Sequence, residues 1–248
     1  MKAKLFAAAA CGLLLSGAVQ AAELKVLGSG AVKEAYSELL PQFEKASGHK
    51  VTVIWAGTVD IKKRMEAGEV YDLVMIASPE MDVLVKDGKV AAGTKVDLVK
   101  SGVGVAVKAG APKPDVSSGE ALKKALIAAK SVGYSTGPSG VYMASLFEKW
   151  GVADQVKAKA KITQPGVPVA TVIRSGEAEI GFQQVSELIH EAGIDFLGPL
   201  PNDIQRITTF SGGIHSNAKE KDAAKALQSF LTAPANAGTL KKHGLSPG

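Results

Sequence analysis

The sequence has 248 residues, of which 46% are hydrophobic, enough to bury the core of one large domain or two modest ones. Its formal net charge of +5 includes Lys2 and Lys4, and only 5% of its residues are aromatic. Lysines are interspersed with acidic residues, as in "EKASGHK", so the composition argues against nucleic acid as a partner.

Residues 1–22 have the pattern of a secretory signal peptide. Two lysines precede an apolar stretch from Leu5 to about Val19, and "VQA" before Ala22 is a small-residue cleavage pattern. The stretch is too short to span a membrane, and no stop-transfer charges follow it. We therefore expect cleavage near Ala22 and a periplasmic protein with a net charge of 5 − 2 = +3.

Cys11 is the only cysteine, and it lies inside the expected signal peptide. The pattern "AAAAC" has an alternative interpretation as a lipid-attachment site, but few apolar residues precede the cysteine. Cleavage near Ala22 would leave no thiol and no disulfide, so the stability of the chain would come from its core.

From residue 24 the chain alternates between short β runs and amphipathic helices. "LKVLGSG" predicts a strand, and apolar residues at three- and four-residue steps predict a helix from Val32 to Ala46, closed by Ser47 and Gly48. "KVTVIWAG" and "VYDLVMIAS" predict two further strands, followed by the helices "TVDIKKRMEAG" and "PEMDVLVKDG". Three such units in a row predict a parallel-rich sheet of the α/β class.

The second half repeats this alternation. "SGVGVAVKAG" predicts a strand, "SSGEALKKALIAAK" a helix, and "SVGYS" leads into a helix that begins near Val141. "VPVATVIRSGEAEIGF" predicts a helix and then a strand, and the chain closes with the strand "ITTFSGGIH" and two helices. The extended runs at 101–107 and 207–214 are the natural crossovers between two lobes, which predicts lobe 1 over residues 23–100 and 207–248, and lobe 2 over residues 101–206.

Six strand-to-helix turns carry small or neutral-polar residues and no Lys, Arg or His. They are 28–31, 57–59, 77–79, 135–140, 164–167 and 183–184. Ser and Thr are good helix N-caps, so any one turn has an ordinary structural explanation. Six together, at helix N-termini whose N–H groups are unpaired, indicate a site that holds an anion or polar solute without a formal countercharge. We expect that site between the lobes.

Enzyme and metal motifs are weak. The four histidines are not spaced as a metal pair with another His, Cys or carboxylate, and "GPSG" is one residue too short for a nucleophile elbow. "GSGAVKE" lacks the spacing of a phosphate-binding loop. We therefore expect no catalytic residue, no metal and no cofactor.

The chain resembles the periplasmic molybdate-binding proteins of ABC importers, which are two-lobed solute-binding proteins. The resemblance is spread over almost the whole mature chain, in "LKVLGSGAVKEAYSELLPQFEKASGHKVTV", "IKKRMEAGEVYDLVMIAS", "GPSGVYMASLFEKWG", "VIRSGEAEIGF" and "ALQSFLTAPANAGTLKKHG". It implies a periplasmic-binding-protein fold, with parallel-rich sheets flanked by helices and a ligand cleft between the lobes. It also implies that hydroxyls and backbone amides of both lobes hold an oxyanion.

Carried over by position, the resemblance places the ligand-binding residues at Ser29, Ala31, Thr58, Ser139, Gly166 and Gln184. Two of these depart from the family pattern. Ala31 stands where the family has a serine, and Gln184 stands where it has a tyrosine whose hydroxyl touches the oxyanion. These changes remove two hydroxyl donors, and a site that discriminates by paired polar groups is sensitive to such losses.

The sequence thus predicts a monomeric, exported solute-binding protein, not an enzyme, that delivers its ligand to an ABC permease at the inner membrane. Molybdate or tungstate is the first expected ligand. The alternative is the same transport with another small anionic or polar ligand, such as a carboxylate. Two further hypotheses, a sensor and an enzyme on the same scaffold, remain.

Overall fold

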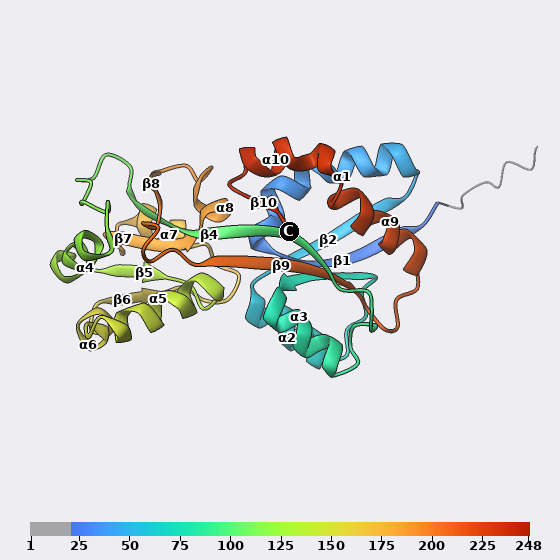
Figure 1. The fold of residues 1–248 in the computed structure, drawn as a ribbon, viewed down its shortest axis with the longest axis horizontal. Coiled ribbons are helices and arrows are strands. Elements are labelled where there is room, and N and C mark those ends of the chain that lie inside the picture. The colour runs from blue at the N-terminus through green and yellow to red at the C-terminus, as the bar shows by residue number, and fades with distance from the viewer. Residues whose placement is uncertain (1–20) are drawn as a thin grey trace, which may run out of the picture.

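The computed structural model describes residues 21–248, and shows a mixed sheet flanked by helices and drawn out into two lobes (Figure 1). The expected α/β class is confirmed. Cys11 and all of the expected signal peptide except its last two residues lie outside the described part. Among the described helices, none has the length and apolarity needed to cross a bilayer.

Lobe 1 is built from the first three βα units and the C-terminal helices. Its elements are β1 (Glu23–Ser29), the short 3-10 turn η1 (Gly30–Val32), α1 (Lys33–Ser47), β2 (Lys50–Ala56), α2 (Thr58–Glu66), β3 (Leu73–Ala77), α3 (Ser78–Lys86), α9 (Lys221–Leu231), η2 (Pro234–Asn236), α10 (Ala237–Lys242) and β10 (Ser246–Pro247). β1 pairs in parallel with both β2 and β3, as the repeated βα units predict. Helix α1 ends at Gly48, whose φ of 74° is left-handed and favours glycine.

Lobe 2 contains the middle of the chain. Its elements are α4 (Gly119–Ala128), β5 (Val132–Tyr134), α5 (Pro138–Lys149), α6 (Ala153–Lys157), β6 (Ala160–Ile162), α7 (Val169–Ser175), β7 (Ile180–Gln184), α8 (Val185–Leu188) and β8 (Ile194–Pro199). β5 pairs in parallel with β6 and β7. The sequence did not predict β6, α6, α8 or β8, all of which have six residues or fewer.

Two long antiparallel strands, β4 (Val96–Lys108) and β9 (Ile207–Ile214), run between the lobes (Figure 1). β4 pairs with β9 as far as Gly102, and with β7 from Val103 onward. It begins five residues before the expected strand at 101–110, because its first part completes the sheet of lobe 1. The residue bounds of the lobes stay a prediction, since these strands belong to both.

Helices cover both faces of the sheet in each lobe, which explains the continuous apolar runs of the strands. In β3, Leu73 and Met75 point into the core beneath α1 and α9, whereas Val74 and Ile76 point into a second core beneath α2 and α3. Each fully buried aliphatic side chain of this kind contributes about 1.5–3 kcal/mol. Lobe 2 likewise has two cores.

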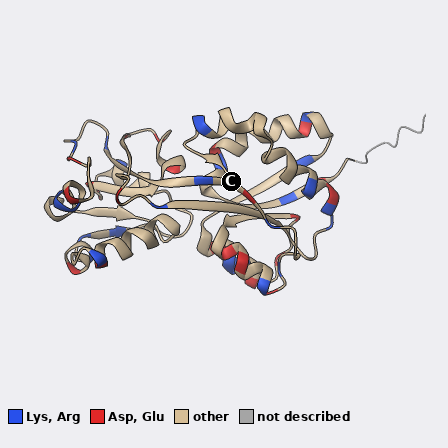
Figure 2. Ribbon diagram, viewed as in Figure 1, with Lys and Arg blue, Asp and Glu red and all other residues tan. Residues whose placement is uncertain are grey.

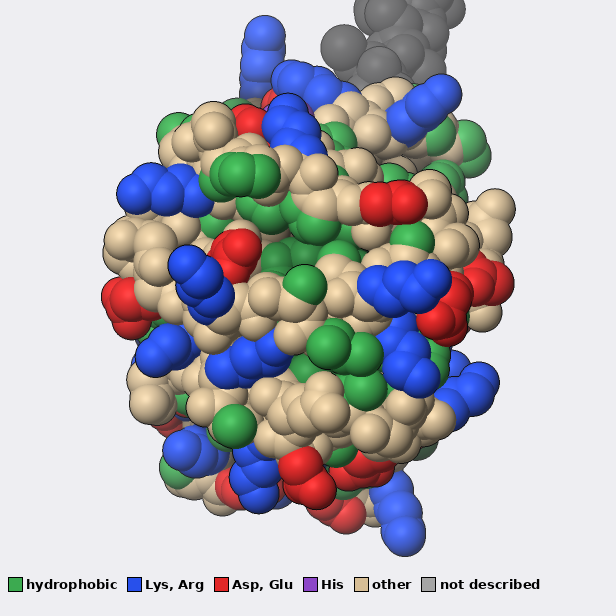
Figure 3. Space-filling view, turned by 90° about the vertical axis from the view of Figure 1, so that its left-hand side faces the viewer, with side chains coloured by type: hydrophobic (Ala, Val, Ile, Leu, Met, Phe, Trp, Pro, Cys, Tyr) green, Lys and Arg blue, Asp and Glu red, His purple; other side chains and the backbone are tan. Residues whose placement is uncertain are grey.

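Charged residues of both signs are dispersed along the helices, strands and loops of both lobes (Figure 2). On the end of the molecule shown in Figure 3, basic and acidic side chains are intermingled around hydrophobic ones. This arrangement agrees with the mixed charge pattern of the sequence, and it places no large patch of one sign on the visible face.

Candidate functional site

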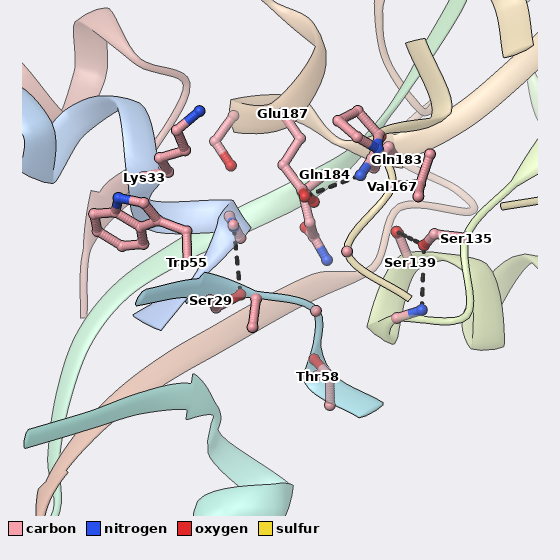
Figure 4. A pocket seen from close by; sticks show the side chains of 18 of the residues that line it. Ser29, Lys33, Trp55, Thr58, Ser135, Ser139, Val167, Gln183, Gln184 and Glu187 are labelled. Atoms are coloured by element: carbon pink, nitrogen blue, oxygen red, sulfur yellow. Dashed lines mark hydrogen bonds between the residues drawn. The ribbon is translucent and has the colours of Figure 1, made fainter. Parts of the chain in front are cut away.

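A cleft of about 650 Å3 lies between the lobes, within the range typical of small-molecule sites. The carboxyl ends of β1 and β2 form one wall, and those of β5 and β7 form the other (Figure 4). All six residues expected at the ligand line this cleft: Ser29, Ala31, Thr58, Ser139, Gly166 and Gln184. Their contact with a ligand stays a prediction.

Five of the six neutral turns lie at the cleft. The third, at 77–79, is not among the lining residues. Ala77 at the end of β3 is paired with Phe210 of β9, and Phe210 lines the cleft instead. The expectation that all six turns face the ligand is therefore wrong for this turn.

The lobe 1 wall carries two hydroxyls. The side-chain oxygen of Ser29 accepts a hydrogen bond from the backbone N–H of Ala31 at 3.3 Å, which orders the turn before α1. Ser29 is buried, and its own hydroxyl hydrogen remains available for a ligand. Thr58 is the first residue of α2, so its hydroxyl lies beside the unpaired N–H groups of that helix start.

The lobe 2 wall is the tight turn that leads into α5. The Ser135 hydroxyl accepts from the backbone N–H of Gly137 at 3.2 Å, and lies 3.4 Å from the hydroxyl of Ser139. A Cβ added at Gly140 would lie 1.6 Å from the carbonyl oxygen of Ser135, so only glycine permits this close turn. The result is a pair of hydroxyls beside the N-terminus of a twelve-residue helix, a favourable place for negative charge.

Gln184 lines the cleft, but its amide is occupied by the strands that join the lobes. In the orientation that satisfies both ends of the amide, the nitrogen donates to the carbonyl oxygens of Ser101 at 3.2 Å and Gly102 at 3.1 Å. The oxygen then accepts from the hydroxyl of Thr208 at 3.1 Å. The side chain at this position therefore holds β4 and β9 together.

Ionisable residues that lie outside the six neutral turns also line the cleft, and the sequence did not point to them as site residues. They are Lys33, Glu34, Glu187, His190 and Glu191. Lys33 lies 3.5 Å from Glu34, and Glu191 lies 3.6 Å from Arg174. Lys33 is the one lysine or arginine among the lining residues of the described chain, and it lies two residues beyond the first turn.

Glu187 has the most perturbed carboxyl of the site. One face of its side chain opens into the cleft, but protein surrounds the rest. Burial raises its pKa to about 7, against hydrogen bonds from Gln183 and from the backbone of Gln184 that lower it, and the charge of Glu191 raises it further. Glu187 lies only three residues beyond the sixth turn, so extending each turn by one helical turn would have found it.

The two lobes approach each other closely at two glycines that line the cleft. A Cβ built on Gly57, at the end of β2, would lie 2.6 Å from the backbone nitrogen of Gly166 in lobe 2. Gly166 has a φ of 76°, a left-handed conformation that favours glycine. Backbone of one lobe therefore lies against backbone of the other at this point.

Within residues 21–248, no group of three or more His, Cys, Asp or Glu side chains is placed to hold a metal ion. The cleft instead combines neutral donors on both walls, one lysine, and a carboxyl that exists in both protonation states near neutral pH. Such a set can bind an anionic ligand and can also exchange a proton with it.

The family model described as bacterial extracellular solute-binding protein matches residues 24–246. The chain is 38% identical over 230 residues to a Pseudomonas protein named aconitate isomerase, covering 90% of this chain and 87% of that protein. It is 28% identical over 242 residues to the molybdate-binding protein ModA of Azotobacter vinelandii, covering 93% of this chain and 92% of that one.

The fold matches as well. A solved periplasmic molybdate-binding protein of Azotobacter vinelandii superimposes with a TM-score of 0.76 at 19% identity, covering 91% of this chain and 99% of that one. These matches confirm the resemblance and the two-lobed fold that the sequence predicted.

Proposed function

The chain belongs to the family of bacterial extracellular solute-binding proteins, and we propose that its cleft binds a small polycarboxylate. We further propose that the bound ligand is aconitate and that the protein interconverts its cis and trans isomers. Aconitate is an unsaturated tricarboxylate, and its isomerisation moves protons and a double bond without net oxidation or reduction. We take this activity from the name of a relative that is 38% identical to this chain. The residues that line the cleft support it.

The observation that carries the proposal is Glu187. A site that only holds an oxyanion needs donors, whereas this cleft also places an ionisable carboxyl among them. Burial raises the pKa of Glu187 to about 7, which is where a general acid or base works best at neutral pH. The sequence predicted a protein that binds without turnover, and Glu187 supports the enzyme hypothesis over that one.

The walls also suit several carboxylates better than one tetrahedral anion. Lys33 lies on the lobe 1 side, and the hydroxyl pair of Ser135 and Ser139 lies across the cleft on the lobe 2 side, with Glu187 between them in Figure 4. Ala31 and Gln184, the two departures from the molybdate-binding pattern, leave the cleft without two hydroxyl donors of that pattern. A ligand with carboxylates at two ends would use the donors that remain.

Charge balance permits an anion despite the glutamates. The Glu34 carboxylate has Lys33 nearby and the Glu191 carboxylate has Arg174 nearby, while Glu187 takes up a proton near neutral pH. The lining therefore carries less negative charge than its three glutamates suggest, and the helix start of α5 adds partial positive charge.

The second candidate function is capture of molybdate or tungstate for delivery to an ABC permease. It is favoured by Ser29, Thr58 and Ser139, neutral donors that remain at the positions carried over from the molybdate-binding family. Export to the periplasm through a signal peptide at residues 1–22, and a monomeric state, belong to both proposals.

Thermal unfolding against a panel of anions separates the two functions. The panel contains cis- and trans-aconitate, the saturated analogue tricarballylate, molybdate, tungstate and sulfate. A ligand at about a hundred times its dissociation constant adds about 2.7 kcal/mol to the free energy of unfolding. We expect stabilisation by the three tricarboxylates and none by the inorganic anions. Stabilisation by molybdate and tungstate alone would support the second function and overturn the first.

A further inference from the structure

We propose that Glu187 is the group that carries the proton in the isomerisation, and that Gln183 positions it. This inference rests on the proposed function and assigns its chemistry to particular atoms. The geometry that supports it is a chain of two short hydrogen bonds that ends at the Glu187 carboxylate and is anchored in the backbone of α7.

The chain begins at Val169, the first residue of α7. Its backbone N–H donates to the side-chain oxygen of Gln183 at 2.7 Å. A backbone N–H can only donate, so this bond determines which end of the Gln183 amide faces which way. The amide nitrogen of Gln183 then donates to the Glu187 carboxylate at 2.9 Å. Gln183 is 4% exposed, so packing holds the amide in place.

The Glu187 carboxylate has no basic side chain as a salt-bridge partner among the described residues. None of the salt bridges among the described residues includes its carboxylate. The charged and titratable groups that share its cleft are Lys33 and Glu34 on α1, and His190 and Glu191 beyond α8. Its hydrogen bond from Gln183 is neutral, so the carboxylate is oriented without being neutralised. A carboxylate so held can still take up a proton.

The carboxylate also lies next to backbone. A Cβ added at Gly30, in the turn after β1, would lie 3.2 Å from the Oε1 atom of Glu187. The side chain thus comes from lobe 2 and reaches the lobe 1 turn that precedes Lys33. A ligand held between the lobes would have this carboxylate beside its carbon chain, with donors for its own carboxylates on both sides.

The proton transfer balances without a cofactor. In aconitate, the CH2 group is next to both a carboxylate and the double bond. The Glu187 carboxylate takes a proton from this carbon, and the electron pair of the broken C–H bond spreads over the three-carbon unit and its carboxylates. The same proton then bonds to the carbon at the far end of the former double bond, and the double bond moves by one position.

The geometry of the product follows from the bound conformation. The new double bond forms where a single bond had been, so its cis or trans arrangement is the one in which that single bond was held. Glu187 ends in the protonation state in which it began. Lys33 and the donors of the α5 turn would stabilise the negative charge that develops on the carboxylates of the intermediate.

The variant Glu187→Gln tests the assignment. Isomerisation is followed by proton NMR with cis-aconitate, and binding is measured by calorimetry with tricarballylate, which has no double bond to move. We expect Glu187→Gln to lower the isomerisation rate by about 100-fold or more, while the tricarballylate dissociation constant stays within about fivefold of wild type. Glu148→Gln, an exposed change on α5, is the matched control and should leave both unchanged.

Gln183→Leu tests the positioning residue through the pH profile. Because the hydrogen bond from Gln183 lowers the pKa of Glu187, its loss should move the midpoint of the rising limb of kcat/KM to higher pH. Gln183→Glu keeps an acceptor for the Val169 N–H and places a like charge beside Glu187, so it should move the midpoint in the same direction even where the leucine variant folds poorly.

The outcomes separate this inference from the proposed function. If the wild-type protein isomerises no aconitate, the proposed function fails. If wild type and Glu187→Gln isomerise equally well, the function stands and Glu187 is not the proton carrier. Loss of tricarballylate binding together with activity would make Glu187 a binding residue and overturn its assignment. If the midpoint of the pH profile is unchanged in both Gln183 variants, Gln183 does not position Glu187.

Discussion

Replacing Gly57 by alanine should weaken ligand binding without destabilising the free protein. Gly57 lines the cleft at the end of β2, and its added methyl group would lie 2.6 Å from the backbone nitrogen of Gly166 in the other lobe. Because the obstacle is backbone and not a flexible side chain, the lobes must move apart to make room. The closed form is thereby penalised, whereas an open form without ligand is not.

The expected size follows from the cost of overpacking. Extra methyl groups in a close contact cost about 1–3 kcal/mol. Each 1.4 kcal/mol is about tenfold in affinity, so the dissociation constant of tricarballylate should rise by about 5- to 150-fold. The melting temperature of the unliganded variant should remain that of wild type.

Calorimetry with tricarballylate measures the affinity, and small-angle scattering at saturating ligand measures compaction. Gly238→Ala is the control, since a Cβ there meets nothing within 4 Å. Equal affinity for Gly57→Ala and wild type would refute the conclusion that the lobes close on this contact. A lowered melting temperature without ligand would show that the methyl group disturbs lobe 1 itself.

Three further predictions concern single side chains. Lys33→Gln should weaken tricarballylate binding about tenfold, since a hydrogen bond to a charged group contributes about 1.5 kcal/mol. Calorimetry measures the affinity, with Lys45→Gln on the outer side of α1 as the control. An equal loss of affinity in both variants would contradict a specific role for Lys33. Tyr36→Phe should raise the free energy of unfolding by about 1 kcal/mol, because the Tyr36 hydroxyl is fully buried and has no partner among the described residues; a loss in urea denaturation would mean that the hydroxyl is satisfied. The pKa of Glu187 is raised to about 7 from its ordinary 4.5, so the folded state holds this proton more tightly, and the free energy of unfolding should fall as pH rises from about 4.5 to 7, by about 3 kcal/mol at most. Urea denaturation at a series of pH values should show this loss in wild type and not in Glu187→Gln. Identical pH dependence in both proteins would contradict the raised pKa of Glu187.

The sequence predicted the βα units of lobe 1 because each strand is a short run rich in β-branched and apolar residues and each helix has a regular apolar stripe. It predicted β4 too short, since the residues from Val96 to Lys100 carry charges and only pairing with β9 makes them a strand. The short elements β6, β8 and α8 have too few residues to show a period. Their structure comes from neighbours that are distant in sequence.

The residues of the candidate site likewise fall into those that the local sequence predicts and those that depend on distant contacts. Hydroxyls at strand ends can be found locally, because a turn before a helix is a sequence feature, and Ser29, Thr58 and Ser139 were found in this way. The raised pKa of Glu187 could not be predicted from its local sequence. It depends on burial beside lobe 1 residues that are more than 150 positions away, such as Gly30. The amide of Gln184 is occupied by Ser101, Gly102 and Thr208, a contact that no local pattern expresses.

The most direct test of the proposed function is a proton NMR time course of the purified protein with cis-aconitate, and separately with trans-aconitate. We predict that both samples reach the same mixture of isomers, at a rate proportional to protein concentration and absent from a protein-free blank. Unchanged spectra in both samples, from protein that molybdate stabilises against heat, would contradict the isomerase and support oxyanion capture instead.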